Sequence, residues 1–342
     1  MHISVRKKIF KFKDFHSPRK SYENLSEQQS ILVSSFNNKI KDGEIKFESV
    51  PCLCGNTEFE LIASVDRYGI LQRTGLCIHC GLILSNPRMT AEEYSNFYSS
   101  DLYRICYQGN DYREICERKY TQKAGQHIFD EVNKAKPINT NTTILEFGAG
   151  GGWNLLPFIK AGAKVLGMDY SPTLVKLGNE HEINMAQGSF NDVRGFYDVI
   201  ILNHVLEHFL NPVDSLKTIA RHLSKDGIIY IAVPNIINFG MGQLQNAHTY
   251  YFTPETFVYY CKQSGLKPIR EGVAEQIHMF GIFELYTSTI TCNFEPQKNY
   301  VRISKLLRKV KFKEYMKTIL RYMCLEKIVR FIRHRISISC AW

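Results

Sequence analysis

The stretch TTILEFGAGGGWN, residues 142–154, places a short apolar strand directly before a run of glycines. Gly148, Gly150 and Gly152 form a G-x-G-x-G pattern that leads into a helical segment. Glycines at such a turn let the backbone bend tightly and approach a ligand, whose polar end meets the helix N-terminus. Asp169 ends the next strand, where an acid can accept hydrogen bonds from ribose hydroxyls. The spacing therefore predicts a cofactor that contains adenosine.

Two details refine this prediction. Glu146 stands at the end of the strand, just before the turn, which adds a second acid to the cofactor site. NAD(P) is the competing ligand, but its fingerprint is G-x-G-x-x-G, and position 153 is Trp153. A purely structural glycine turn is the remaining alternative.

Further short apolar segments follow the glycine turn and alternate with helical stretches. They read AKVLGMDYS at 163–171, YDVIILN at 197–203, DGIIYIAVPN at 226–235 and FGIFELYTS at 280–288. Strands that alternate with helices indicate a doubly wound α/β fold with a parallel sheet.

From about residue 140 to 290 the chain resembles the class I S-adenosylmethionine-dependent methyltransferases. The resemblance rests on LEFGAGGG, GMDYSP, AQGSFNDV, YDVIILNHVLEHFLNP and GIIYIAVPN together. It implies a Rossmann-like sheet of seven strands in the order 3-2-1-4-5-7-6, with the seventh strand antiparallel. It also implies that the glycine loop underlies the methionine moiety and that Asp169 binds the ribose. Gly188, Ser189 and Phe190 would flank the adenine, while Asn203 and His204 would face the methyl-bearing end.

One segment also matches a different pattern. His204, Glu207 and His208 form H-x-x-E-H, which is typical of inverted zinc peptidases. A peptidase would need the pair on a helix and would have no use for the glycine–acid pair upstream, so we reject that interpretation. We expect Glu207 and His208 to open the helix after the fourth strand, and His204 or His208 either to remove a hydroxyl proton or to shape the acceptor site.

A second candidate base lies in NAHTYYFTPETF, residues 246–257. His248 and the aromatic pair beside it follow the fifth strand, on the side of the fold where we expect the acceptor. The alternative is that this loop only packs as a lid. Thr253 is expected to cap the next helix, with Pro254 in its first turn.

Four cysteines occur in two close pairs before the glycine turn. Cys52 and Cys54 form C-x-C-G, and Cys77 and Cys80 form C-x-x-C-G, with 22 residues between the pairs. Four thiolates can close a tetrahedron around zinc, which leaves no open position for catalysis. The sequence thus predicts a structural Zn²⁺ site, with ordinary buried cysteines as the alternative.

The segment after the second cysteine pair reads GLILSNPRMTAEEYSNFYSSDLYR and is rich in tyrosine. This arrangement resembles bacterial methyltransferases of surface-polysaccharide and deoxysugar biosynthesis, which carry such a module before the methyltransferase domain. The resemblance implies contacts to the acceptor, with ordinary helix packing as the alternative. The residues concerned are Tyr94, Tyr98, Tyr103, Arg104 and Tyr107.

The net charge of +10 lies at the two ends of the chain. Residues 302–342 hold twelve Lys/Arg and two acids, and residues 1–20 hold seven Lys/Arg and one acid. Apolar residues recur at helical spacing in the C-terminal part, which predicts a basic amphipathic helix that either contacts a membrane surface or packs on the domain. The body between the ends is acidic, which makes nucleic acid an unlikely partner.

These observations divide the chain into five parts and suggest a cytoplasmic enzyme, either free or peripheral on the inner face of the cell membrane. The parts are a polar arm (1–48), a zinc module (49–90), a helical connector (91–140), a methyltransferase domain (141–290) and a basic helical tail (291–342). We expect S-adenosylmethionine-dependent O-methylation of a sugar-containing acceptor, either a nucleotide sugar or a lipid-linked glycan. The alternatives are sugar C-methylation, RNA methylation and a cofactor-binding scaffold without activity.

Overall fold

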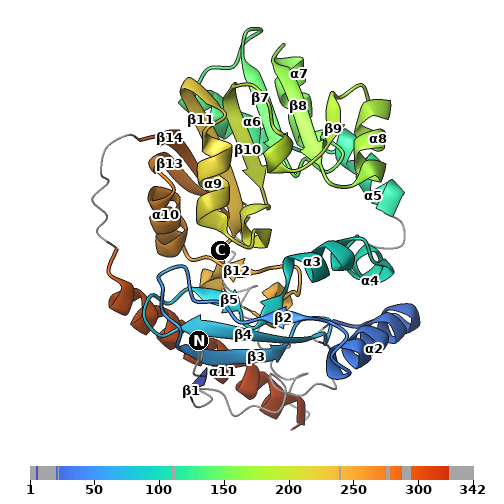
Figure 1. Ribbon diagram of the computed structural model, residues 1–342, viewed down its shortest axis with the longest axis vertical. Coiled ribbons are helices and arrows are strands. Elements are labelled where there is room, and N and C mark those ends of the chain that lie inside the picture. The colour runs from blue at the N-terminus through green and yellow to red at the C-terminus, as the bar shows by residue number, and fades with distance from the viewer. Residues whose placement is uncertain are drawn as a thin grey trace, which may run out of the picture.

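The computed structural model describes residues 5–6, 21, 23–108, 112–238, 240–274, 278–286 and 294–322. A seven-stranded sheet forms the upper part of the molecule in Figure 1. Strand β14 is antiparallel to both of its neighbours, and the other strands run parallel to one another. In spatial order the strands are β13 (Leu266–Ala274), β14 (His278–Leu285), β11 (Leu223–Pro234), β10 (Tyr197–Asn203), β7 (Thr143–Phe147), β8 (Lys164–Asp169) and β9 (Met185–Gln187).

This sheet confirms the predicted doubly wound α/β fold. When the seven strands of this sheet are numbered 1 to 7 in chain order, their spatial order from β9 to β13 is 3-2-1-4-5-7-6, as the resemblance implied. Successive strand residues face opposite cores: Ile144 packs on one side of the sheet and Leu145 on the other. The first face is covered by α6 (Gln126–Ala135), α7 (Leu156–Lys160) and α8 (Pro172–Glu180), and the second by α9 (Pro212–Ala220) and α10 (Pro254–Gln263).

A smaller, five-stranded sheet lies below the first in Figure 1. Its last strand comes from within the methyltransferase segment, between β11 and β13, because Tyr250 pairs with Leu84 and Tyr251 with Ile83. The sheet of the cysteine-containing segment is therefore completed by residues that follow β11. In spatial order its strands are β1 (Val5–Arg6), β3 (Phe59–Val65), β4 (Leu71–Cys77), β5 (Ile83–Ser85) and β12 (Tyr250–Tyr251), while β2 (Phe47–Glu48) pairs separately with β6 (Arg88–Met89).

Helices from the first part of the chain lie beside and between the two sheets (Figure 1). Ser26 begins α2 (Glu27–Lys41) with a reciprocal capping box to Gln29. This signal was present in a segment that otherwise showed no helical periodicity. The remaining elements of this region are α3 (Ala91–Tyr98), α4 (Asp101–Tyr103), the π-helical turn η1 (Arg104–Gln108) and α5 (Tyr112–Thr121).

The C-terminal helix α11 (Pro296–Tyr322) crosses the smaller sheet (Figure 1). Ile303 and Leu307 are buried in a core shared with β3, β4 and β5. For these turns the packing alternative is confirmed, whereas Phe312 and Met316 further along are exposed. The rest of the predicted basic tail, from residue 323 onward, lies outside the described residues. Within the described part of the chain, no helix has the length and apolarity to cross a membrane.

Candidate functional site

The glycine loop after β7 has the backbone that the sequence predicted. Gly148 and Gly150 have φ values of 67° and 59°, which side-chain-bearing residues rarely adopt. A Cβ on Gly148 would lie 2.5 Å from a methyl carbon of Val205, so the loop after β10 sits directly against the glycine loop. The two loops therefore meet at the carboxyl ends of adjacent strands, where doubly wound folds bind their ligands.

Two acids flank this loop. Asp169 accepts hydrogen bonds from the backbone N–H of Gly150 at 2.8 Å and of Ser171 at 2.9 Å, which fixes its carboxylate beside the loop. Glu146 is fully buried and accepts from Asn154 Nδ2 at 2.8 Å through Oε1. Its Oε2 has no hydrogen-bond partner among the described residues. Burial raises the pKa of Glu146 to about 8, against the hydrogen bond from Asn154.

The orphaned Glu146 oxygen and the open glycine backbone fit a bound S-adenosylmethionine. A buried polar atom without a partner is costly, and the ammonium group of the cofactor's methionine moiety is a hydrogen-bond donor that would satisfy it. Ser189 caps the short 3₁₀ helix η3 (Phe190–Asp192), and the ring of Phe190 lies against those of Phe147 and Phe209. Phe190 is only half buried, which leaves ring surface for an adenine.

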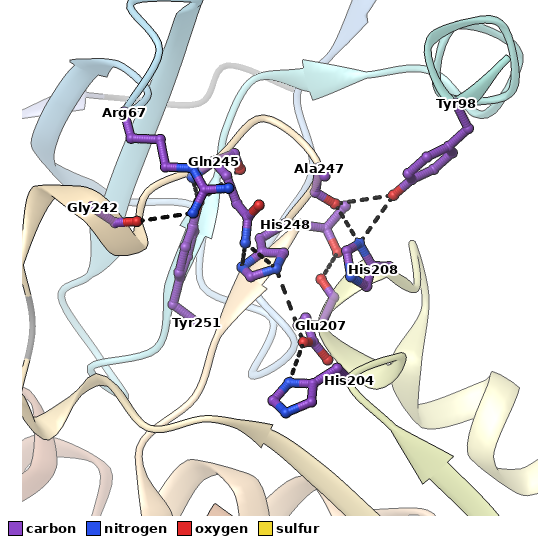
Figure 2. A network of polar contacts seen from close by, with 11 residues as sticks. Arg67, Tyr98, His204, Glu207, His208, Gly242, Gln245, Ala247, His248 and Tyr251 are labelled. Carbon is purple, nitrogen blue, oxygen red and sulfur yellow. Dashed lines mark hydrogen bonds and ion pairs between the residues drawn. The ribbon is translucent and has the colours of Figure 1, made fainter. Parts of the chain in front are cut away.

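A cluster of histidines surrounds Glu207 beside the cofactor loop (Figure 2). His204 has φ of 58°, a strained left-handed conformation for a residue with a side chain, and its Nδ1 lies 3.3 Å from Glu207 Oε1. His248 Nε2 lies 4.0 Å from the same oxygen. The side chain of His204 remains 32% exposed, against 7% for His248, so His204 is the more accessible of these two.

The charges in this cluster follow from its burial. Burial alone would raise the pKa of Glu207, but the His204 hydrogen bond and the neighbouring imidazoles lower it to about 2. Burial lowers the pKa of His248 well below its usual value, and the nearby His208 acts in the same direction. Glu207 is thus a carboxylate and His248 a neutral imidazole near neutral pH.

The tyrosine-rich segment closes one side of the cluster. Tyr98 OH lies 3.1 Å from both His208 Nδ1 and the carbonyl oxygen of Ala247. Burial, and to a lesser extent the negative charge of Asp169, raise the pKa of Tyr103 to about 12. Tyr103 is therefore close enough to the predicted cofactor site to interact electrostatically with Asp169. Tyr98 and Tyr103 therefore link the predicted acceptor side to the predicted cofactor side.

Other predicted residues lie elsewhere. Tyr94 is buried in the core under α2 and α3, Tyr107 donates to Asp66 Oδ2 at 3.0 Å, and Arg104 pairs with Asp101 on the surface. Asn203 ends β10 and is half buried.

The expectation that Glu207 and His208 open a helix is wrong. They lie in the 3₁₀ turn η4 (Leu206–His208), and α9 begins at Pro212 after the capping residue Asn211. A helix dipole therefore does not account for the position of Glu207. As predicted, Thr253 caps α10 and Pro254 occupies its first turn.

Two residues of the site were missed by sequence reasoning. The side-chain amide of Gln245 lies 2.6 Å from His248 Nε2, and the ring of His278 lies 4.3 Å from that of His204. Neither residue belongs to a recognisable motif, and His278 enters the site only because β14 pairs with β11.

The four cysteines come together as the sequence predicted. Cys52 Sγ lies 3.5 Å from Cys80 Sγ, and Cys54 Sγ lies 3.6 Å from Cys77 Sγ. Zinc–sulfur bonds of about 2.3 Å place tetrahedral sulfurs about 3.8 Å apart, so the cluster is compatible with a zinc ion. The glycine after each pair, Gly55 or Gly81, has a positive φ that allows the tight turn.

Comparisons with known proteins agree with this architecture. Residues 118–271 match the family described as a methyltransferase domain. The ubiquinone biosynthesis O-methyltransferase of Caulobacter vibrioides is 25% identical over 130 residues, 35% of this chain and 52% of that protein. The enzyme of the same name from Pelagibacter ubique is 29% identical over 109 residues, 29% of this chain and 45% of that protein. The chain thus spans about half the length of these curated relatives.

Among solved structures, the 1,6-didemethyltoxoflavin-N1-methyltransferase of Burkholderia thailandensis, with bound S-adenosylhomocysteine, is similar with a TM-score of 0.47. The identity is 16%, and the similarity covers 60% of this chain and 96% of that one.

Proposed function

We propose that this protein, whose residues 118–271 match the family described as a methyltransferase domain, transfers a methyl group from S-adenosylmethionine to a hydroxyl oxygen of a small-molecule acceptor. One observation carries the proposal: the His204–Glu207 pair stands beside the glycine loop. Val205, which follows His204, would touch a Cβ at Gly148. The Glu207 carboxylate thus orients the His204 imidazole next to the glycine loop that is predicted to bind the cofactor.

We assign the following roles to the residues at the carboxyl ends of β7, β8 and β10. Asp169 and Glu146 hold the ribose and ammonium ends of the cofactor, and the glycine loop admits its backbone. Bound S-adenosylmethionine supplies an electrophilic methyl group, so the chain must orient the acceptor and receive its proton.

His204 is suited to receive that proton. Its Nδ1–H donates to Glu207 Oε1, which leaves Nε2 unprotonated and able to accept the hydroxyl proton. Glu207 is then a positioning residue, because it fixes the tautomer and stabilises the imidazolium that forms.

The acceptor class is also part of the proposal. Tyr98 contacts His208 and packs edge-on against Tyr103, and aromatic rings of this kind suit either a sugar face or a planar ring. We propose a hydroxylated acceptor and favour a sugar, as the cysteine module and tyrosine-rich segment suggested. An intermediate of ubiquinone biosynthesis, as the names of the curated relatives suggest, is the comparison acceptor.

The cysteine cluster has a separate role in this proposal. Its sulfurs are mostly buried and continuous with the core of the larger sheet, so we propose a structural Zn²⁺ there. The ion would join the two cysteine turns and thereby hold β12 and its loop in place.

Calorimetric titration with S-adenosylhomocysteine tests the cofactor site. We expect micromolar binding by the wild type and a loss of at least about tenfold in Asp169→Ala, since the ribose hydroxyls lose their acceptor. Asp214→Ala, on the exposed surface of α9, should bind like the wild type. A folded wild-type protein that binds no S-adenosylhomocysteine would overturn the proposal.

Transfer of a labelled methyl group to a panel of nucleotide sugars, glycolipids and phenols tests the acceptor. His204→Gln should keep its affinity for S-adenosylhomocysteine and lose about 10²- to 10⁴-fold in kcat, as expected for a general base. Unchanged kcat in this variant would remove His204 from that role.

A further inference from the structure

The cluster around Glu207 contains a set of donor atoms that the proton-transfer role of His204 does not use. Glu207, His208 and His248 each direct one donor atom to a common region, with all three atoms within 4.8 Å of one another. Within the described residues, this set and the four cysteines are the two groups of this kind. Glu207 is 1% exposed and His248 5% exposed, so these are interior side chains.

The carboxylate of Glu207 is incompletely paired. Oε1 is engaged by His204 at 3.3 Å, whereas Oε2 is buried and, in the part of the chain that the structure describes, has no hydrogen-bond partner. A buried carboxylate oxygen without a donor is costly, and coordination of a cation is one of the few ways to satisfy it.

His208 is oriented as a metal ligand would be. Its Nδ1 lies 2.9 Å from the carbonyl oxygen of Ala247. A carbonyl can only accept, so Nδ1 carries the proton and the Nε2 lone pair is left for another partner. A metal-binding histidine typically donates its second ring N–H to a carbonyl in this way, which fixes both the tautomer and the ring.

His248 completes the set from a different part of the chain. Its ring centre lies 4.8 Å from that of His208, and its Nε2 lies 4.0 Å from Glu207 Oε1. The amide nitrogen of Gln245 lies 2.6 Å from this Nε2. Figure 2 draws this contact as a dashed line between the two side chains. Gln245 is only half buried, so its side chain can move aside for an ion.

We propose that Glu207, His208 and His248 bind one divalent transition-metal ion. Two imidazole nitrogens and one carboxylate oxygen suit zinc, cobalt or manganese, and three protein ligands leave at least one position open. The site differs from the cysteine cluster in ligand type, in position and in having this open position.

This inference deepens the proposed function and, for its catalytic meaning, rests on it. An acceptor hydroxyl bound to the open position would lose its proton more readily, and that proton would pass to His204 Nε2. The ion would keep its oxidation state throughout. The acceptor class is then narrowed to hydroxyl compounds whose oxygen can ligate a metal, such as vicinal diols and catechols.

Metal counting on the full-length protein tests the site. Co²⁺ is added in increasing equivalents, loosely bound ions are removed by gel filtration, and the metals retained per chain are measured by mass spectrometry. We expect the wild type to retain one ion more per chain than His208→Ala and His248→Ala. His222→Ala is the matched control, since His222 lies at the opposite end of β10 and its ring contacts the Gly195 carbonyl. His204→Gln should also retain the additional ion.

Absorption spectra separate the two sites. The additional Co²⁺ should give ligand-field bands without the intense thiolate-to-cobalt charge transfer that the cysteine cluster would produce. Circular dichroism checks that each variant is folded, and the additional ion should raise Tm in the wild type but not in the two histidine variants. Equal ion counts in the wild type and both folded histidine variants would overturn the inference.

Measuring both Co²⁺ retention and S-adenosylhomocysteine binding distinguishes failure of the metal site from failure of the proposed function. Binding of S-adenosylhomocysteine without the additional ion would leave the methyltransferase proposal standing and remove the metal site. The additional ion without S-adenosylhomocysteine binding would establish the metal site and overturn its assigned role in methyl transfer.

Discussion

The four-cysteine cluster and the Glu207 cluster are both assembled from separate turns, but the turns differ in how they are positioned. The cysteines lie in two glycine-containing turns, one before β3 and one at the end of β4, and these two strands pair with each other. The Glu207 cluster joins the loop after β10 to the loop before β12, and Thr249 connects the two through hydrogen bonds to the Glu207 carbonyl. A local motif therefore defines the first cluster, whereas the pairing of β12 with β5 brings the second together.

The largest effect is expected from breaking the local cluster. Cys80→Ser removes a fully buried ligand in the main core, so we expect loss of the ion and of most of the folding free energy, about 5 kcal/mol or more. Thermal unfolding and zinc content measure both. Cys261→Ala is the control, because Cys261 is equally buried but outside the cluster. Equal Tm and zinc content in the two variants would show that the cysteines bind no structural ion.

A second prediction concerns Glu146, the buried acid beside the glycine loop. The pKa of Glu146 is raised from 4.5 to about 8, so the folded chain holds this proton over a range where the unfolded chain has released it. The raised pKa of Glu146 adds to the free energy of unfolding. This contribution is complete below about pH 4.5 and is lost as pH rises through 8, by up to about 1.4 kcal/mol per pH unit. Glu146→Gln should lose this dependence.

The measurement is urea unfolding of wild type and Glu146→Gln at several pH values between 5 and 9. The difference between the two free energies should change with pH, in favour of the variant at high pH. A difference that stays constant across this range would contradict the protonated state assigned to Glu146.

A third prediction tests whether α11 supports the smaller sheet. Leu307→Ala should lower the free energy of unfolding by about 2–4 kcal/mol, because Leu307 is 2% exposed against Ile62 and Leu76. Phe312→Ala, on the same helix but 64% exposed, should change it by less than about 0.5 kcal/mol. Denaturant unfolding compares the two variants. Similar small effects at both positions would mean that α11 does not contribute to this core.

The smallest effect is expected at Thr249, which connects the two loops of the Glu207 cluster. Thr249 is 1% exposed, and its hydroxyl lies 2.9 Å from the Glu207 carbonyl oxygen and 2.8 Å from that of Phe209. Thr249→Val keeps the shape and removes this donor, which should cost about 1–2 kcal/mol in unfolding and weaken binding of the additional Co²⁺. Thr249→Ser should restore both. If Thr249→Val binds Co²⁺ like the wild type, the hydroxyl does not position the cluster.

Several parts of the fold could be predicted because the relevant signals are short in sequence. Strands β7, β8, β10, β11 and β14 appeared as apolar segments, and the capping of α10 by Thr253 followed from residue type alone. Helix α2 was missed because its apolar residues are sparse, although Ser26 and Gln29 carried a capping signal. Glu207 and His208 were assigned to a helix that in fact begins at Pro212.

The sequence by itself determined the order of strands and glycine turns, the acids of the cofactor loop and the two cysteine pairs. Each depends on residues a few positions apart, where backbone freedom and hydrophobic periodicity act directly. Only the tertiary structure decided that β12 completes the sheet of the cysteine segment, and that Glu207, His208 and His248 converge. The physical reason is that these contacts depend on which strands pair across long stretches of chain, and burial of both cores settles that pairing.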